Sequence, residues 1–197
     1  MIPHIEVTQE VTVEPVTLET VKSHCNIDAD ITKDDALLMA DITVAREYGE
    51  SLTGRSWAKK SLRLTMCQFP SALGPIELKR PPLVSVDSVE FIGYNGEKTT
   101  LAPETYVVIS GIVPAIVPAA GSAWPQSNGR PDSVIVNYTA GYDSLPKSLQ
   151  QWLLVRVSGL YEQRENFVIG TGGLEASSMP RDFVDGLLDA YAIPEGL

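Results

Sequence analysis

Histidine and cysteine are scarce in this chain, which has two of each among its 197 residues. Cys25 and Cys67 form no C-x-x-C pair and no closely spaced metal motif, which argues against a disulfide framework and a zinc site. His4 and His24 come with no serine-hydrolase or zinc-protease motif. A catalytic His24–Cys25 pair is therefore less favoured than a surface histidine beside a packed thiol. We expect no catalytic residues, no metal and no cofactor.

Long apolar runs are missing as well. The sequence has no run of about 18 apolar residues, the length that a membrane-spanning helix needs. The first residues, MIPHIEVTQEV, lack the basic region and the apolar core of a signal peptide. We therefore expect a soluble protein that is not secreted and does not bind a membrane.

The chain has fewer basic than acidic residues, 15 against 25, and its net charge is −10. Residues 1–55 carry 4 basic and 11 acidic side chains, and residues 143–197 carry 4 and 8. Residues 56–142 carry 7 and 6 and are nearly neutral. This balance disfavours a protein that grips nucleic-acid phosphates. It is compatible with a protein that lets DNA pass without sticking.

Two short patterns resemble binding sites but lack the context that such sites need. Asp28, Asp30 and Asp34 suggest calcium, yet the central glycine and terminal glutamate of an EF-hand loop are absent, which favours a solvated linker. The glycine-rich run at 168–174, VIGTGGL, resembles a nucleotide-binding loop. A dinucleotide site needs a βαβ unit, and the remaining sequence has room for one helix only.

The strongest positive signal is a helical period over residues 33–57. Asp34 and Asp35 suit a helix N-terminus, where unpaired N–H groups favour negative charge. Gly54 suits a left-handed C-terminal cap. The predicted apolar stripe consists of Leu38, Ile42, Ala45, Gly49 and Leu52, with Leu37, Val44 and Tyr48 on its flank.

Three further helices are predicted near the chain ends. The first is capped by Thr17 and ends near Asn26. The second begins at Pro146 and runs to about Glu165. The third is amphipathic and presents Phe183, Leu187 and Tyr191 on one face.

Between these helices the apolar period changes from 3.6 to 2, which predicts strands. Strands are expected near 62–66, 76–78, 84–91, 106–109, 112–117 and 134–138. The pattern of 84–91 slips by one residue, as at a β-bulge. Asn95–Gly96 predicts a hairpin with a type I′ turn. The opening segment, up to Glu14, is either an extended arm or an edge strand, and we expect the arm.

The predicted fold class is α+β, with a small helical bundle built from both chain ends and an inserted all-β unit of sandwich or barrel type. The expected domain organisation is an N-terminal arm and helices over 1–55, the β unit over 56–142, and C-terminal helices over 143–197 that complete the bundle. The helix of 33–57 and the helix from Pro146 should pack together at the base of the insert.

The order of these features resembles the head-tail connector, or adaptor, proteins of long-tailed phages and prophages, in the version with a β insert between its helices. The segments that carry the resemblance are PVTLETVKSHCNID, AREYGESLTGRSW, LRLTMCQFP, RPPLVSVDSVEFI, AWPQSNGRPDSVIVNYTAGY and LYEQREN with the glycine-rich run behind it. The chain departs from the family pattern in GIVPAIVPAAG and in its C-terminal tail.

The resemblance implies a homo-oligomeric ring, usually dodecameric, under the portal protein of the filled head. Such a ring is made in the host cytoplasm, becomes part of the virion neck, and offers a platform to a stopper or tail protein. Double-stranded DNA passes through its centre without sequence-specific binding. The family is structural, so the resemblance assigns no active site.

On this interpretation the acidic helical part faces the channel, because an acidic lining repels phosphate and lets DNA slide. The candidate channel residues are Asp34, Asp35, Asp41, Glu47 and Glu50. The candidate portal contact is the face of Phe183, Leu187 and Tyr191, with Val168 and Ile169 as a second partner surface. The alternative is that the last helix completes the bundle of its own subunit.

Two other classes of function stay open at this stage. One is a different neck component, such as a stopper or tail-completion protein. The other is a ligand-binding β module with a pocket near Tyr106 and Trp124.

Overall fold

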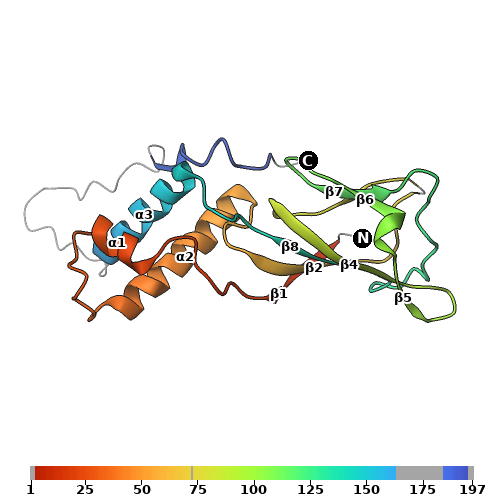
Figure 1. Ribbon diagram of the computed structural model, residues 1–197, viewed down its shortest axis with the longest axis horizontal. Helices are drawn as coiled ribbons and strands as arrows, with labels where there is room; N and C mark the ends of the chain where they lie inside the picture. The colour runs from red at the N-terminus through yellow and green to blue at the C-terminus, as the bar shows by residue number, and fades with distance from the viewer. Residues whose placement is uncertain (1–2, 72, 163–183, 195–197) are drawn as a thin grey trace, which may run out of the picture. The chain divides into compact units, whose positions relative to one another are not determined.

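The computed structural model describes residues 3–71, 73–162 and 184–194. The chain divides into two compact units. The β unit comprises Met1–Val13, Gly54–Asp143 and Ile193–Leu197, and the helical unit comprises Glu14–Thr53 and Ser144–Ala192. Each unit is thus assembled from segments that are far apart in the sequence (Figure 1). The predicted α+β class is confirmed.

The helical unit contains three helices, α1 (Leu18–His24), α2 (Asp35–Thr53) and α3 (Lys147–Glu162). The predicted N-cap of α1 is confirmed, because the Thr17 side chain accepts a hydrogen bond from the backbone N–H of Thr20 at 3.2 Å. Asn26 ends this turn with a positive φ of 54°. The predicted cap after α2 is also confirmed, with φ of 68° at Gly54. Both helices therefore begin and end close to the positions that the sequence predicts.

The buried stripe of α2 agrees with the prediction at four positions and differs at the fifth. Leu38, Ile42, Ala45 and Gly49 are buried, whereas Leu52 is 43% exposed. The last buried position is Thr53, whose hydroxyl donates to the carbonyl oxygen of Gly49 at 2.8 Å. The buried face is also wider than predicted, since it takes in Arg46 and Glu50, which the apolar pattern places off the stripe.

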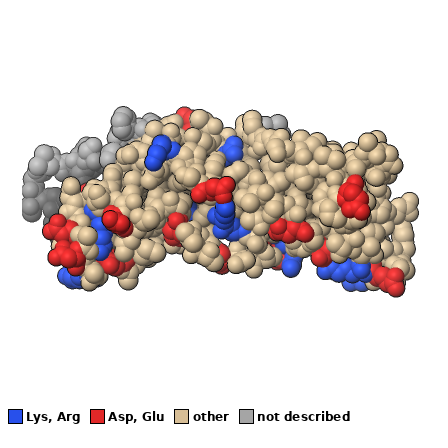
Figure 2. All heavy atoms as spheres, in the orientation of Figure 1, with Lys and Arg blue, Asp and Glu red and all other residues tan. Residues whose placement is uncertain are grey.

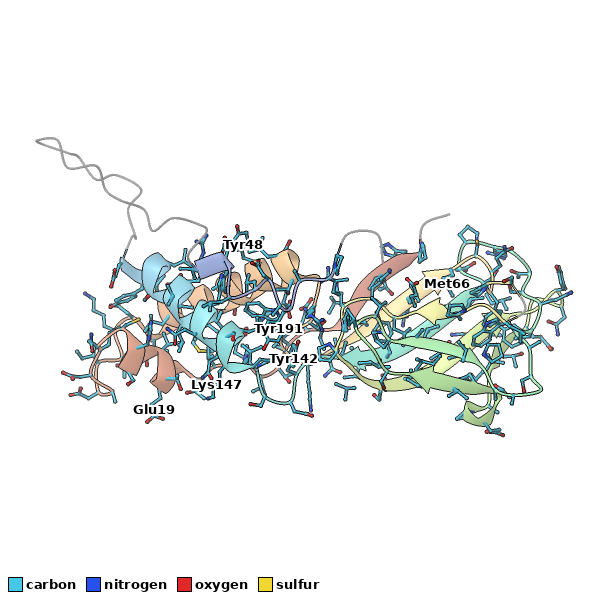
Figure 3. The ribbon with its side chains drawn as sticks, turned by 90° about the horizontal axis from the view of Figure 1, so that it is seen from above. Glu19, Tyr48, Met66, Tyr142, Lys147 and Tyr191 are labelled. Atoms are coloured by element: carbon cyan, nitrogen blue, oxygen red, sulfur yellow. The ribbon has the colours of Figure 1, made fainter. Side chains whose placement is uncertain are left out.

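Helix α3 packs against both α1 and α2. Leu149, Trp152, Leu153 and Val157 are its fully buried positions. The ring of Tyr48 on α2, labelled in Figure 3, lies 6.1 Å from the Trp152 ring, and the Arg156 guanidinium lies 5.0 Å from the centre of the Tyr48 ring. The predicted packing of the two longest helices is confirmed.

The β unit holds two antiparallel sheets. The five-stranded sheet has the order β1-β2-β8-β4-β5, and the three-stranded sheet has the order β3-β7-β6. Their bounds are β1 His4–Gln9, β2 Lys60–Met66, β3 Ile76–Glu77, β4 Leu83–Ile92, β5 Lys98–Thr100, β6 Tyr106–Ile109, β7 Ala115–Pro118 and β8 Val134–Ala140, with a 3-10 turn, η1, at Pro103–Thr105.

Both sheets contribute to one hydrophobic core. Strand β8 lies inside the larger sheet and alternates between buried and half-buried residues, with Val134, Val136 and Tyr138 on the buried side. Ile116 of the smaller sheet joins the same core, and Phe69 stacks on Trp124 with ring centres 5.1 Å apart. The β unit is therefore a small sandwich in which each sheet covers the apolar face of the other.

The N-terminal segment is a strand rather than the arm that we expect from the sequence. His4–Gln9 pairs antiparallel with β2, with Ile5 opposite Leu64, and forms one edge of the larger sheet. Only two apolar residues, Ile5 and Val7, alternate in this segment, and so short a pattern cannot distinguish an edge strand from an extended arm. The ladder to β2 decides between them.

The hairpin at Asn95–Gly96 is confirmed, but its turn differs from the predicted type I′. The backbone N–H of Gly96 donates to the carbonyl of Gly93, and that of Gly93 to Glu97. Gly96 has a φ of 79°, whereas Asn95 does not have a positive φ. This geometry is that of a longer loop with one left-handed glycine. The bulge expected in 84–91 is confirmed by two register shifts between β4 and β8.

In the part of the chain that the structure describes, we find no helix with the length and apolar character to cross a membrane.

Candidate functional site

The carboxylates at the start of α2 are engaged inside the helical unit. The Tyr161 hydroxyl donates to Asp34 Oδ2 at 2.9 Å, and Lys22 Nζ lies 2.5 Å from Asp35 Oδ1. Both aspartates are half-buried. Asp34 and Asp35 therefore tie α3 and α1 to the start of α2, and each keeps part of its surface open to solvent.

Lys22 organises the loop before α2. Its side chain is buried, and Nζ donates to the carbonyl oxygens of Ile31 at 2.8 Å and Ala29 at 3.4 Å. Its third partner is the carboxylate of Asp35. An ammonium group thus supplies the positive charge at the centre of this loop. Among the described residues, no group of His, Cys, Asp and Glu side chains is arranged to hold a metal ion.

The three remaining channel candidates on α2 differ in exposure. The Glu47 side chain is 63% exposed and points to solvent. Asp41 is half-buried. Glu50 is only 3% exposed at its side chain and lies 3.1 Å from Arg46 Nη1. Burial and ion pairing remove Glu50 from any solvent-facing surface of the subunit.

Glu50 belongs to a buried cluster centred on Arg46. Arg46 Nε lies 2.8 Å from Glu14 Oε2, and its Nη2 lies 3.4 Å from the other oxygen of the same carboxylate. The Thr43 hydroxyl also donates to Glu14, at 2.8 Å. The cluster fixes the Glu14 segment to the middle of α2. The sequence gives no signal for it, because Glu14 and Arg46 are separated by 32 positions.

The two carboxylates decide the charge state of Arg46. Burial by itself lowers the pKa of this guanidinium, but the hydrogen bond to Glu14 and the negative charges of Glu14, Glu50 and Glu47 raise it above its ordinary value. Arg46 stays charged, and its fork of donors can serve both carboxylates at once.

The candidate partner surface near the C-terminus is only partly described. Val168, Ile169 and Phe183 lie outside the described residues. Leu187 is 36% exposed, and Tyr191 is half-buried in the helical unit (Figure 3). These two residues are available in part for a contact with another protein.

The chain around Leu187 also packs within its own unit. Leu188 is only 4% exposed, and the Trp152 indole N–H on α3 donates to Asp185 Oδ1 at 2.9 Å. We expect a continuous helix here with Asp185 facing away from the bundle. Instead, residues 184–185 are helical, residues 186–191 form turns, and Asp185 faces α3. Turns change which side chains share a face, so the helical spacing of apolar residues in the sequence does not predict the buried face here.

Two groups with catalytic or ligand-binding potential have structural roles. The pKa of Cys25 is raised by burial and by the nearby carboxylates of Glu162 and Asp41, which keeps the thiol protonated and unreactive. Trp124 is 8% exposed, stacks on Phe69, and donates its indole N–H to the carbonyl of Gly74 at 2.7 Å. Trp124 is therefore part of the core rather than the wall of an open pocket.

Red carboxylate groups lie among uncharged and basic residues on the visible surface of the helical unit, and much of the visible surface of the β unit is uncharged (Figure 2). The described residues form ion pairs, hydrogen bonds and a packed core. A family comparison gives the decisive observation, because residues 15–99 match the model of the phage gp6-like head-tail connector protein family. The matched region belongs to that family. The resemblance that the sequence predicts is confirmed.

Solved structures extend the likeness of this chain beyond the matched region. A chain from the neck of an empty gene transfer agent (GTA) particle, computed with C6 symmetry, is similar over 98% of this chain and 97% of its own, with a TM-score of 0.78 and 19% identity. A chain from the virion of a native GTA particle gives a TM-score of 0.76, with the same identity and coverage.

A chain from the neck of a native GTA particle, computed with C12 symmetry, gives a TM-score of 0.73 at 19% identity, over 98% of this chain and 97% of its own. The comparison with curated proteins finds no match. At this identity the likeness establishes a shared fold, which includes both the helical unit and the β unit.

Proposed function

We propose that this chain is a subunit of a ring, dodecameric in the assembled particle, that joins the portal protein of the DNA-filled head to the next neck or tail protein. The family match carries this proposal, since it covers α1, α2 and the strands β2, β3 and β4. The fold shared with neck chains over 98% of the sequence supports it. The function is mechanical, without a catalytic step or a cofactor.

We further propose that double-stranded DNA passes through the centre of the ring along the acidic helical unit. The candidate lining residues are Asp34, Asp35, Asp41 and Glu47. Of these four, Glu47 is exposed and the three aspartates are half-buried. A lining of this sign has no strong attraction for phosphate, so DNA is not held during ejection. Glu50 is left out of the lining because it is buried against Arg46.

The portal contact is proposed at Leu187 and Tyr191, together with Phe183. Val168 and Ile169 form a second partner surface in this proposal. Leu187 is the exposed large apolar side chain of residues 184–194, and in this proposal it forms an apolar contact patch together with Phe183 and Tyr191.

Location in a particle tests the function directly. We expect a density map of the particle to show this chain as a closed ring directly beneath the portal, with Glu47 lining the channel. A ring in another layer of the neck would identify the chain as a stopper or tail-completion protein instead. A ring with Glu47 on its outer surface would contradict the channel assignment and leave the connector role intact.

A further inference from the structure

Strand β6 has the sequence of a buried strand but lies at an exposed edge. Val107, Val108 and Ile109 are 50%, 41% and 49% exposed, and Ile112 just beyond the strand is 61% exposed. Consecutive aliphatic residues normally belong to strands that are covered on both faces. Here neighbours on both faces of β6 reach solvent, so the strand is only half covered within one subunit.

The backbone of β6 also has a free side, because β6 ends the order β3-β7-β6. The N–H of Ala119 donates to the carbonyl of Thr105, which places the bonded pairs of this ladder at odd-numbered residues of β6. The N–H and C=O of Val108 therefore point away from β7, to the open edge. An edge of this kind binds another extended strand.

The four sheet edges of the β unit differ in their protection. Strand β3 has two residues, and β5 has three polar residues with Lys98 paired to Glu90. Short strands and edge lysines discourage pairing. In contrast, β6 lies in a region, 106–129, that contains no charged side chain.

The other long edge strand is β1, which carries one carboxylate, Glu6, and a register shift between Val7 and Gln9. It is six residues long, and its burial pattern is exposed at four of them, with Val7 at 38% exposure. Strand β1 ends the larger sheet, whereas β6 ends the smaller one, and the two strands run along opposite sides of the β unit in Figure 1. Among the described strands, none pairs with the outer edge of β1 or with the outer edge of β6.

We propose that β6 of one copy pairs edge to edge with β1 of the next copy, so that a β-ladder joins neighbouring subunits. This proposal rests on the ring proposed above. A head-to-tail contact uses both open edges once in every copy and leaves none exposed when the ring closes. The ladder would cover the aliphatic side chains of β6 at the same time.

Proline substitution tests the role of the β6 edge. Val108→Pro removes the N–H that points to the open edge and leaves the bonds to β7 in place. Thr100→Pro is the matched control, since the N–H of Leu101 bonds to Val89 and the N–H of Thr100 therefore points to the free side of β5. In sedimentation over a concentration series, we expect Val108→Pro to weaken self-association by about tenfold or more and Thr100→Pro to leave it unchanged.

Lysine variants test the pairing of β6 with β1 and keep every backbone hydrogen bond. Val107→Lys and Val7→Lys each place a charge at one edge, at positions exposed enough for the folded monomer to accept it. We expect each variant alone to be monomeric. An equimolar mixture keeps one intact β6 edge and one intact β1 edge, so it should form a dimer and nothing larger.

Circular dichroism and the melting temperature show that each variant is folded before its mass is interpreted. The ladder is contradicted by a monomeric wild type at the highest concentration, by equal effects of Val108→Pro and Thr100→Pro, or by a mixture that stays monomeric. None of these results affects the connector role, which depends on the position of the chain in the particle. A ring found in the particle without a β6–β1 contact would reject the ladder alone.

Discussion

At the scale of single residues, the helical unit depends on charges that are inside it. Arg46 joins Glu14 to Glu50, and Lys22 joins the loop before α2 to Asp35. Both cations are buried, and each has a carboxylate partner. A buried ion pair is weak evidence for net stability, but removing one partner leaves the other charge buried and uncompensated. The sequence pattern alone gives no sign that these charged residues are buried or paired.

Replacing Arg46 should therefore strongly destabilise the protein. Arg46→Met keeps most of the side-chain volume but leaves Glu14 and Glu50 without their cation, and we expect a loss of about 3–5 kcal/mol in the free energy of unfolding. Arg63→Met is the control, because Arg63 and Glu6 form a pair in which each side chain is 43% exposed. The control should lose less than about 1 kcal/mol. Similar losses for both variants in chemical denaturation would contradict the prediction that removing the cation costs more in the buried Arg46 cluster than in the exposed Arg63–Glu6 pair.

The buried phenol of Tyr138 should make the stability of the protein depend on pH in alkaline solution. Its ring is buried, its hydroxyl donates to the carbonyl of Lys79 at 2.9 Å, and burial raises the pKa of this phenol to about 12. An unfolded tyrosine ionises near pH 10. The neutral phenol is favoured in the folded state, so this contribution to stability is present below pH 10 and is lost as the pH rises to about 12.

Comparison of the wild type with Tyr138→Phe isolates this effect. Phenylalanine cannot ionise, so the difference in melting temperature between the two proteins should shrink as the pH rises from about 10 to about 12. At neutral pH the variant should be less stable, because the carbonyl of Lys79 loses its donor. A constant difference across this range would mean that Tyr138 does not titrate as the structure implies.

At the scale of secondary-structure elements, local chemistry predicts most of what is observed. Thr17, Asn26 and Gly54 mark helix ends because caps and left-handed residues satisfy or end the backbone hydrogen bonds locally. Strands β2 and β8 show period 2 because one of their faces is buried. The elements that the sequence misjudges, the N-terminal segment and the end of the chain, have short patterns that depend on distant partners.

Replacing either of two glycines by alanine should change the stability of the protein, with opposite signs at the two positions. Gly54 has a positive φ at the end of α2, so Gly54→Ala should lower stability by about 1 kcal/mol. Gly159 lies inside α3, and an added Cβ meets nothing within 4 Å. Gly159→Ala should raise stability by about 0.5–1 kcal/mol through helix propensity. In thermal unfolding, a Gly54→Ala variant as stable as the wild type would contradict the assigned cap, and a destabilised Gly159→Ala variant would contradict the open space at Gly159.

At the scale of the whole molecule, the C-terminal segment has two proposed roles, packing within its own subunit and contact with the portal. Two neighbouring leucines, Leu188 and Leu187, allow these roles to be tested separately. Leu188 is 4% exposed, and Leu188→Ala should lower the free energy of unfolding by about 2–4 kcal/mol. Leu187 is 36% exposed, and Leu187→Ala should change stability by less than about 1 kcal/mol while weakening attachment to portal-bearing heads. Full attachment by the Leu187 variant in a head-binding assay would contradict the proposed portal contact.

The sequence by itself determined the fold class, the family resemblance, most element boundaries and the acidic character of the chain ends. These properties follow from local periodicity, from capping residues and from composition, which act over a few positions. Only the tertiary structure decided that Glu50 is buried, that Glu14 is bound to Arg46, and that β1 and β6 are open sheet edges. Those outcomes depend on which distant segments meet, and neither periodicity nor composition contains that information.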